Sequence, residues 1–66
     1  MELIFNGETT TFERGGSVKD FIESLGLPEK GIAVERNLEI VPKSAYADTQ
    51  LESGDKLEII QFVGGG

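Results

Sequence analysis

"LIFNGETTTFERGGSVKDFIESLGLP" (residues 3–28) decides the fold, because it predicts a β-hairpin followed at once by a helix. Asn6-Gly7 is a strong hairpin signal, since both residues tolerate the positive φ that a type I′ turn requires. The flanking segments Met1–Phe5 and Glu8–Glu13 carry strand-forming residues. A strict two-residue turn places Phe5 opposite Glu8, and a slightly longer turn is the alternative.

The second half of this stretch predicts a short helix of about two turns. Ser17 and Asp20 are spaced as in a capping box, with Asp replacing the usual Glu. Gly26 suits the position just after a helix, and Pro28 prevents its continuation. One apolar stripe at helical spacing runs through Val18, Phe21, Ile22 and Leu25.

Downstream of the helix, the sequence predicts three more strands. Ile32–Glu35 and Ile40-Val41 are the third and fourth, and Lys56–Val63 is the last and most apolar. Between the third and fourth strands, a type I′ turn would favour glycine where Leu38 stands, so we expect another turn type. Lys43–Gln50 has no clean period and is expected to hold a short helical turn.

The element order is therefore strand, strand, helix, strand, strand, strand. One mixed sheet of about five strands with one helix packed across it is an α+β, two-layer domain. The right-handed crossover rule places the strand after the helix parallel to a hairpin strand, which leaves few topologies. A ubiquitin-like β-grasp over residues 1–63 is the natural one, followed by a flexible glycine tail over residues 64–66.

The last strand has two different faces. With a period of two, Leu57 and Ile59 point to the helix, whereas Ile60 and Phe62 point to the open face of the sheet, next to the tail. Ile60 and Phe62 would then form an apolar docking patch for a partner. The alternatives are that they pack against the Lys43–Gln50 segment, or that they are isolated exposed residues of no consequence.

Composition excludes several kinds of chemistry. The chain has no Cys and no His, so it offers no thiol nucleophile, imidazole base, disulfide or zinc-type site. Its carboxylates form no defined pair, and we read the chain as lacking an active site of its own. Gly15-Gly16 before Ser17 could bind an anion at the helix start, but a capped loop is the favoured interpretation.

The charge balance bears on partners and location. Twelve acidic and six basic residues give a net charge of −6, which argues against nucleic acid. A basic protein partner fits this charge, although net charge also keeps small proteins soluble. Met1–Phe5 is too short for a signal peptide, and no run approaches the roughly 20 apolar residues of a membrane span. A cytoplasmic monomer is the expectation.

The sequence finishes on three glycines, Gly64, Gly65 and Gly66. Without Cβ atoms, this arm can enter a narrow channel in another protein and adopt the conformation imposed there. Its reactive group would be the α-carboxylate of Gly66. A carboxylate resists displacement until an oxygen becomes a leaving group, and adenylation by ATP achieves this. The ATP site, Mg²⁺ and charge-stabilising side chains would have to come from a partner.

The chain also resembles a known family over essentially its whole length. The resemblance is carried by "LIFNGE" (3–8), "VERNLEIVPKS" (34–44), "LESGDKLEI" (51–59) and "FVGGG" (62–66). Together these stretches resemble the ubiquitin-like sulfur carriers of the ThiS family. Gly65 and Gly66 match the family's terminal pair, whereas Leu38 departs from its pattern, in which glycine often follows the asparagine.

This resemblance implies a function. A ThiF-type adenylating enzyme would adenylate Gly66, which would then become a thiocarboxylate and deliver sulfur to thiazole synthase (ThiG-type) for thiamine biosynthesis. The chain would be a carrier and not an enzyme, with ATP and Mg²⁺ used by the activating partner. Val63, Gly64 and Gly65, with the docking patch, would contact partners.

Four alternatives remain at this point, one of which is a carrier for the synthesis of cysteine or of another sulfur metabolite. A related carrier, the small subunit of molybdopterin synthase (MoaD), shares the fold and tail but is usually longer. A ubiquitin-like protein modifier would pass the activated tail to a lysine amine. A non-catalytic interaction module would carry the tail incidentally.

Overall fold

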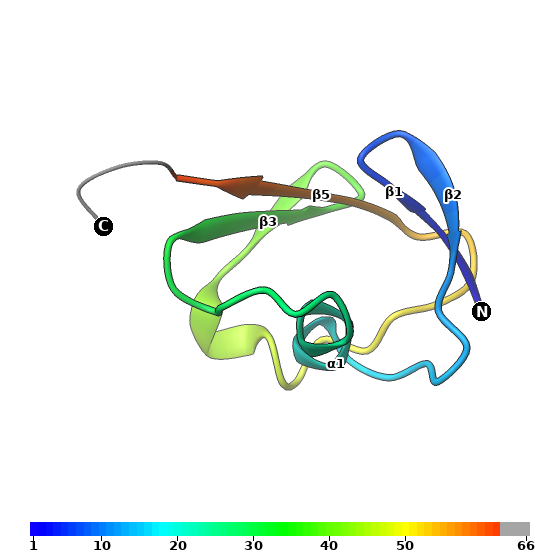
Figure 1. Ribbon diagram of the computed structural model, residues 1–66, viewed down its shortest axis with the longest axis horizontal. Coiled ribbons are helices and arrows are strands. Elements are labelled where there is room, and N and C mark those ends of the chain that lie inside the picture. The colour runs from blue at the N-terminus through cyan, green and yellow to red at the C-terminus, as the bar shows by residue number, and fades with distance from the viewer. Residues whose placement is uncertain (63–66) are drawn as a thin grey trace.

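The computed structural model describes residues 1–62, which form a mixed sheet crossed on one face by a helix (Figure 1). Within this range the α+β prediction of five strands and one helix is confirmed. The elements in chain order are β1 (Glu2–Phe5), β2 (Glu8–Thr11), α1 (Val18–Ser24), β3 (Ile32–Arg36), β4 (Glu39–Val41), the 3-10 turn η1 (Lys43–Ala45) and β5 (Lys56–Gln61).

The hairpin β1–β2 has the register that a two-residue turn requires. Leu3 pairs with Thr10 and Phe5 pairs with Glu8, so the slightly longer turn does not occur. Asn6 and Gly7 both have positive φ, 49° and 84°, as the type I′ turn predicts.

A capping box begins α1, as the sequence predicts. The Asp20 backbone N–H donates to Ser17 Oγ over 3.2 Å, and the Ser17 N–H donates to Asp20 Oδ2 over 2.9 Å. The bond from the Ser17 backbone, together with the Ser17 hydroxyl and Arg14, holds the pKa of Asp20 below its ordinary value against the opposing effect of burial. Because Asp20 already occupies the Ser17 N–H, this helix start offers little to an external anion.

The strands lie in the order β2-β1-β5-β3-β4, so the last strand to be made occupies the centre of the sheet. It pairs in parallel with β1 and antiparallel with β3. The strand after the helix, β3, runs parallel to β2 without lying beside it, because β1 and β5 separate the two. This places the end of β5 at the edge of the molecule opposite the N-terminus (Figure 1).

The core lies between the sheet and α1. Its largest fully buried side chains are Phe21, Leu3, Ile22, Leu57, Val18 and Val34. The Phe21 ring packs edge-on against Phe5 and Phe12, with centroids 5.3 and 5.2 Å away. The stripe predicted from helical spacing is thus the buried face of α1, except that Leu25 is only partly buried.

The turn between β3 and β4 corrects a prediction. Asn37 and Leu38 both have positive φ, 52° and 71°, which is the sign pattern of a type I′ turn despite the leucine. Hydrogen bonds of Asn37 explain this: its backbone N–H donates to the Lys56 carbonyl and its side chain donates to Asp55. Leu38 therefore adopts a conformation that its Cβ disfavours, because its neighbour is held in place.

Replacing Leu38 with glycine is expected to stabilise the protein by about 1 kcal/mol, because glycine adopts positive φ without steric cost. The matched control is Asn37→Gly, at the other positive-φ position of the turn. This control should instead lose about 1–2 kcal/mol, because it removes hydrogen bonds to Asp55 and Lys56. Urea unfolding of both variants measures these changes, and a loss of stability in Leu38→Gly would contradict the assigned strain.

Candidate functional site

The end of β5 is the part of the described chain nearest to the glycines. Leu57 and Ile59 are buried under α1, whereas Ile60 and Phe62 are 60% and 67% exposed. The period of two in the sequence thus predicts both faces of this strand. Val63 and Gly64–Gly66 lie outside the described residues, so the roles assigned to them stay predictions.

The segment after β4 does not cover Ile60 and Phe62. It holds the expected helical turn, η1, and then runs past the start of α1. There the backbone carbonyl of Tyr46 accepts from the Lys19 N–H, and the backbone carbonyl of Thr49 accepts from the Val18 N–H. Tyr46 is buried on that side of the sheet. The alternative in which this segment packs on Ile60 and Phe62 is therefore wrong.

Asn6 secures the last part of β5, a role that the hairpin signal alone does not indicate. Its side-chain Oδ1 accepts from the Ile59 N–H over 2.9 Å, and its Nδ2 donates to the Ile59 carbonyl over 3.4 Å. The amide thereby continues the pairing of β5 beyond the end of β1. On the other side, the Phe62 N–H donates to the Gly31 carbonyl over 2.8 Å. The strand is thus held on the β1 side up to Ile59 and on the β3 side up to Phe62.

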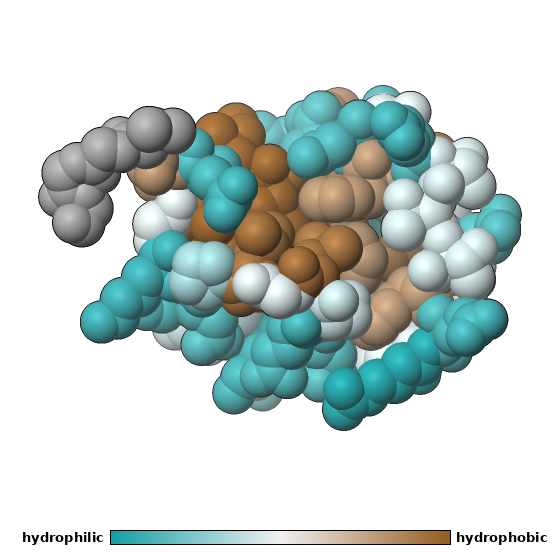
Figure 2. All heavy atoms as spheres, viewed as in Figure 1, coloured by the Kyte–Doolittle hydropathy of each residue, from teal (hydrophilic) through white to brown (hydrophobic). Residues whose placement is uncertain are grey.

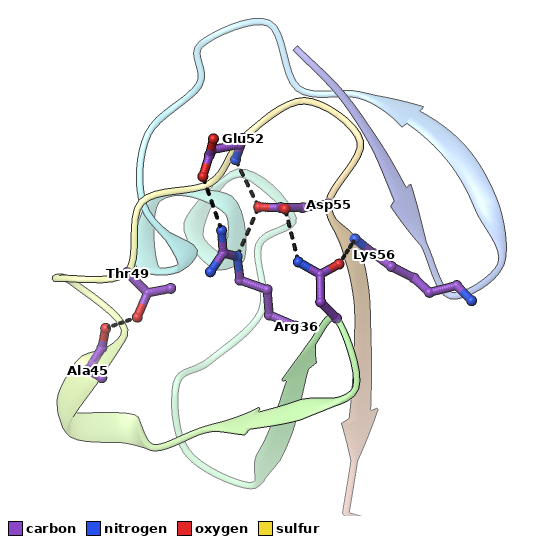
Figure 3. Close-up of polar contacts among 7 residues, drawn as sticks. Arg36, Ala45, Thr49, Glu52, Asp55 and Lys56 are labelled. Carbon is purple, nitrogen blue, oxygen red and sulfur yellow. Dashed lines mark hydrogen bonds and ion pairs between the residues drawn. The ribbon is translucent and has the colours of Figure 1, made fainter.

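A buried carboxylate secures the beginning of β5. Asp55 Oδ2 accepts from Arg36 Nε over 2.9 Å and from the Glu52 N–H over 2.8 Å, as Figure 3 shows. Asp55 Oδ1 accepts from Asn37 Nδ2 over 3.1 Å. Burial alone would raise the pKa of Asp55, but the bonds from Glu52, Asn37 and Arg36 outweigh it and hold that pKa below its ordinary value.

This cluster explains the stretch "LESGDKLEI" in physical terms. Leu51, Leu57 and Ile59 are core residues, and Gly54 turns the chain with a φ of 91°. Asp55 then ties this turn to the β3–β4 hairpin. The motif that carries the family resemblance is therefore the structural mount of the central strand.

Two exposed apolar side chains were not predicted. Ile40 on β4 is 66% exposed and Leu38 in the preceding turn is 81% exposed. The pairing of β3 with β4 and β5 places Ile40 on the same open face as Ile60. A three-residue strand gives too little period to assign a face from sequence. We call Ile40, Ile60 and Phe62 the apolar patch of the open face.

On the helix side of β5, apolar side chains also reach the surface. Figure 2 shows apolar atoms gathered between β5 and α1. A pocket of about 270 Å³ lies in this region, lined by Phe5, Asn6, Leu25, Leu27, Ile59 and Gln61. The last residues of β5 thus present apolar surface on both faces of the sheet.

Residues 1–62 contain no group of three or more His, Cys, Asp or Glu side chains placed to hold a metal ion. Among the same residues, no helix is both long and apolar enough to cross a membrane.

A small mixed sheet with one crossing helix, whose central last strand leads to a glycine run, defines a ubiquitin-like β-grasp protein. The model of the ThiS family matches residues 3–66, which includes all three final glycines. The chain belongs to the ThiS family.

Individual relatives agree with this assignment. The chain is 38% identical to the sulfur carrier protein ThiS of Bacillus subtilis, over 97% of this chain and 98% of that protein. It is similar to the crystal structure of a thiamine biosynthesis protein (ThiS) from Geobacter metallireducens, with a TM-score of 0.84, 29% identity and full coverage of both chains.

One relative is a longer protein that contains a region similar to this chain. The chain is 50% identical over all its 66 residues to part of a thiazole synthase of Paramagnetospirillum magneticum. It spans about a fifth of the length of that protein and of a second thiazole synthase that it matches.

Proposed function

We propose that this chain is a sulfur carrier for thiamine biosynthesis that acts through the carboxylate of Gly66. The observation that carries the proposal is the ThiS family match, which extends through the final glycines. The position of β5 supports it, because this strand is held by Asn6 at Ile59 and by Gly31 at Phe62, and it precedes the glycine arm in the sequence.

The chemistry takes two displacements. A Gly66 carboxylate oxygen attacks the α-phosphorus of ATP, and pyrophosphate leaves with the electrons of the broken P–O bond. Sulfide then attacks the acyl carbon of the adenylate. AMP leaves, and the C-terminus carries a thiocarboxylate that can transfer sulfur to an acceptor.

The partner supplies what this composition lacks. A ThiF-type adenylating enzyme would bind ATP and Mg²⁺ and would provide the cationic groups that stabilise charge on the phosphates. This chain would contribute a side-chain-free arm, which reaches roughly 10 Å when its three residues are extended. It is then a protein co-substrate of the adenylating enzyme and has no catalytic side chain of its own.

Thiazole synthase is the proposed sulfur acceptor. Support comes from the two thiazole synthases that contain a region similar to this chain. The curated carriers among the relatives are named ThiS, which favours thiamine over molybdopterin synthesis. Proteins that act in sequence are often joined in one polypeptide, and this juxtaposition raises the effective concentration of each for the other.

The proposed contact surface consists of the tail and the residues before it. Val63, Gly64 and Gly65 would line the partner's channel, and Ile60 and Phe62 would dock beside its entrance. When these exposed apolar side chains are buried against the partner, the contact helps to position the neighbouring tail in the partner's active site.

Adenylation can be measured separately from sulfur transfer. Radioactive pyrophosphate is expected to exchange into ATP when the ThiF-type enzyme of the same organism is mixed with this chain, because the first displacement is reversible. A variant lacking Gly65 and Gly66 is the control and should support no exchange. Equal exchange with the truncated variant would reject Gly66 as the reactive residue and would favour a role that does not need the tail.

Phe62→Asp is expected to weaken binding to the adenylating enzyme by about 100-fold while leaving the melting temperature nearly unchanged. The reason is that Phe62 is 67% exposed and buries its area only in the complex. Thr9→Asp is the matched control, because Thr9 is exposed and lies on the edge strand β2, which β1 separates from β5. Calorimetric titration and thermal unfolding measure the two quantities. A large drop in melting temperature with normal binding would instead make Phe62 a stabilising residue of the fold.

A further inference from the structure

The open face of the sheet carries two carboxylates within the apolar patch. Glu35 on β3 lies directly opposite Glu58 on β5, and Ile40 on β4 lies opposite Glu35 on its other side. Ile60 follows Glu58 by two residues, so it projects from the same face. The two carboxylates are therefore flanked by Ile40 across the sheet and by Ile60 along β5.

This arrangement is unfavourable in the protein alone. Directly opposed residues of an antiparallel pair have Cβ atoms about 5 Å apart, and like charges there destabilise a sheet. Neither carboxylate forms an ion pair with any residue between 1 and 62. The other charged residues on this face are Lys56, two residues before Glu58, and Glu2 on β1.

A like-charge pair at a central position of the sheet, with no ion pair of its own among residues 1–62, can bind a cation from a partner. A guanidinium fits it, because its planar fork carries five donors and can bond two carboxylates at once. The surrounding Ile40, Ile60 and Phe62 would exclude water from such a contact, and charge attraction strengthens as water leaves. A lone ammonium satisfies two separated carboxylates less well.

We infer that Glu35 and Glu58 together receive an arginine of the adenylating enzyme, inside an interface whose apolar rim is Ile40, Ile60 and Phe62. The inference rests on the proposed function for the identity of this partner. It extends the docking surface from β5 across β3 to β4, and it adds charge selectivity to a patch that is otherwise only apolar. The net charge of −6 attracts the same basic surface from a distance.

The double variant Glu35→Gln/Glu58→Gln tests this inference. Its affinity for the ThiF-type enzyme should fall by about tenfold at low salt, and the difference from the unmodified chain should shrink as salt is raised. Its melting temperature should be equal or higher, because the repulsion within the pair is gone. Binding and stability thus move in opposite directions, which a merely structural role would not produce.

Glu23→Gln is the matched control, because Glu23 is exposed on α1, which lies across the other face of the sheet. It changes charge by one unit and should leave affinity within about twofold. If the double variant binds as tightly as the unmodified chain, the inference is wrong even when adenylation of Gly66 proceeds normally. A lower melting temperature that accompanies the weaker binding would overturn it too. Failure of the unmodified chain to support adenylation would instead reject the proposed function.

Discussion

Adding one alanine after Gly66 should reduce adenylation at least about 100-fold while the melting temperature stays the same. The extension replaces the Gly66 carboxylate by an amide and moves the new carboxylate by roughly 3.5 Å. A misplacement of about 1 Å already costs about 100-fold in rate when reacting groups must be aligned. The fold should not respond, because the extension changes none of the core residues found within 1–62.

A cleavable form of the same extension provides the control. A protease that cuts after Gly66 regenerates the original carboxylate, and pyrophosphate exchange should return to the level of the unextended chain. Normal exchange before cleavage would mean that the reactive group lies elsewhere. Lost exchange that cleavage does not restore would point to damage of the fold and not to the position of the carboxylate.

Asp55→Asn should have the largest effect on stability among the substitutions proposed for the described residues, a loss of about 2–3 kcal/mol. A 66-residue domain has about 3–10 kcal/mol in all, so this loss is a large share. Only 10% of the Asp55 side chain and 26% of the Arg36 side chain are exposed, and the substitution leaves Arg36 only the exposed Glu52 carboxylate, 3.7 Å away. The new amide also places a donor against the Asn37 donor.

The pH dependence gives this prediction a second readout. The pKa of Asp55 is lowered in the folded state, so its contribution is complete above the unfolded-state pKa of about 3.9. It is lost as the pH falls through the lower pKa of the folded state. The stability difference between the unmodified chain and Asp55→Asn should therefore be constant near neutral pH and should narrow in acid.

Asp48→Asn is the matched control for Asp55→Asn, because Asp48 is exposed and the pKa of Asp55 does not depend on it. Urea unfolding between pH 3 and pH 7 should show a nearly unchanged free energy for the control. A difference between Asp55→Asn and the unmodified chain that does not narrow in acid would show that the ionised carboxylate is not what stabilises the turn.

Local signals in the sequence were sufficient for much of the fold. The Asn6-Gly7 turn, the Ser17–Asp20 capping box and the apolar stripe of α1 each depend on residues a few positions apart, and each is present. The turn at Leu38 was not predictable in this way. Its conformation is imposed by Asp55 and Lys56, which are 18 or 19 positions from Asn37 in the chain.

In the candidate site, too, only the features that depend on nearby residues could be predicted from the sequence. The exposure of Ile60 and Phe62 follows from the alternation of a single strand. The place of Ile40 beside Glu35, and of Glu35 beside Glu58, requires the register between three strands, which no local pattern gives. The contact of Asn6 with Ile59 spans 53 positions and was equally hidden.

The central claim is that the Gly66 carboxylate becomes a thiocarboxylate, and intact-mass spectrometry tests it most directly. The chain is incubated with the ThiF-type enzyme, ATP and a sulfide source, using an enzyme preparation shown to modify another ThiS family carrier. The account predicts a mass gain equal to replacing one oxygen by sulfur, and fragmentation should locate that gain on Gly66. An unchanged mass, or a gain located elsewhere in the chain, would contradict it.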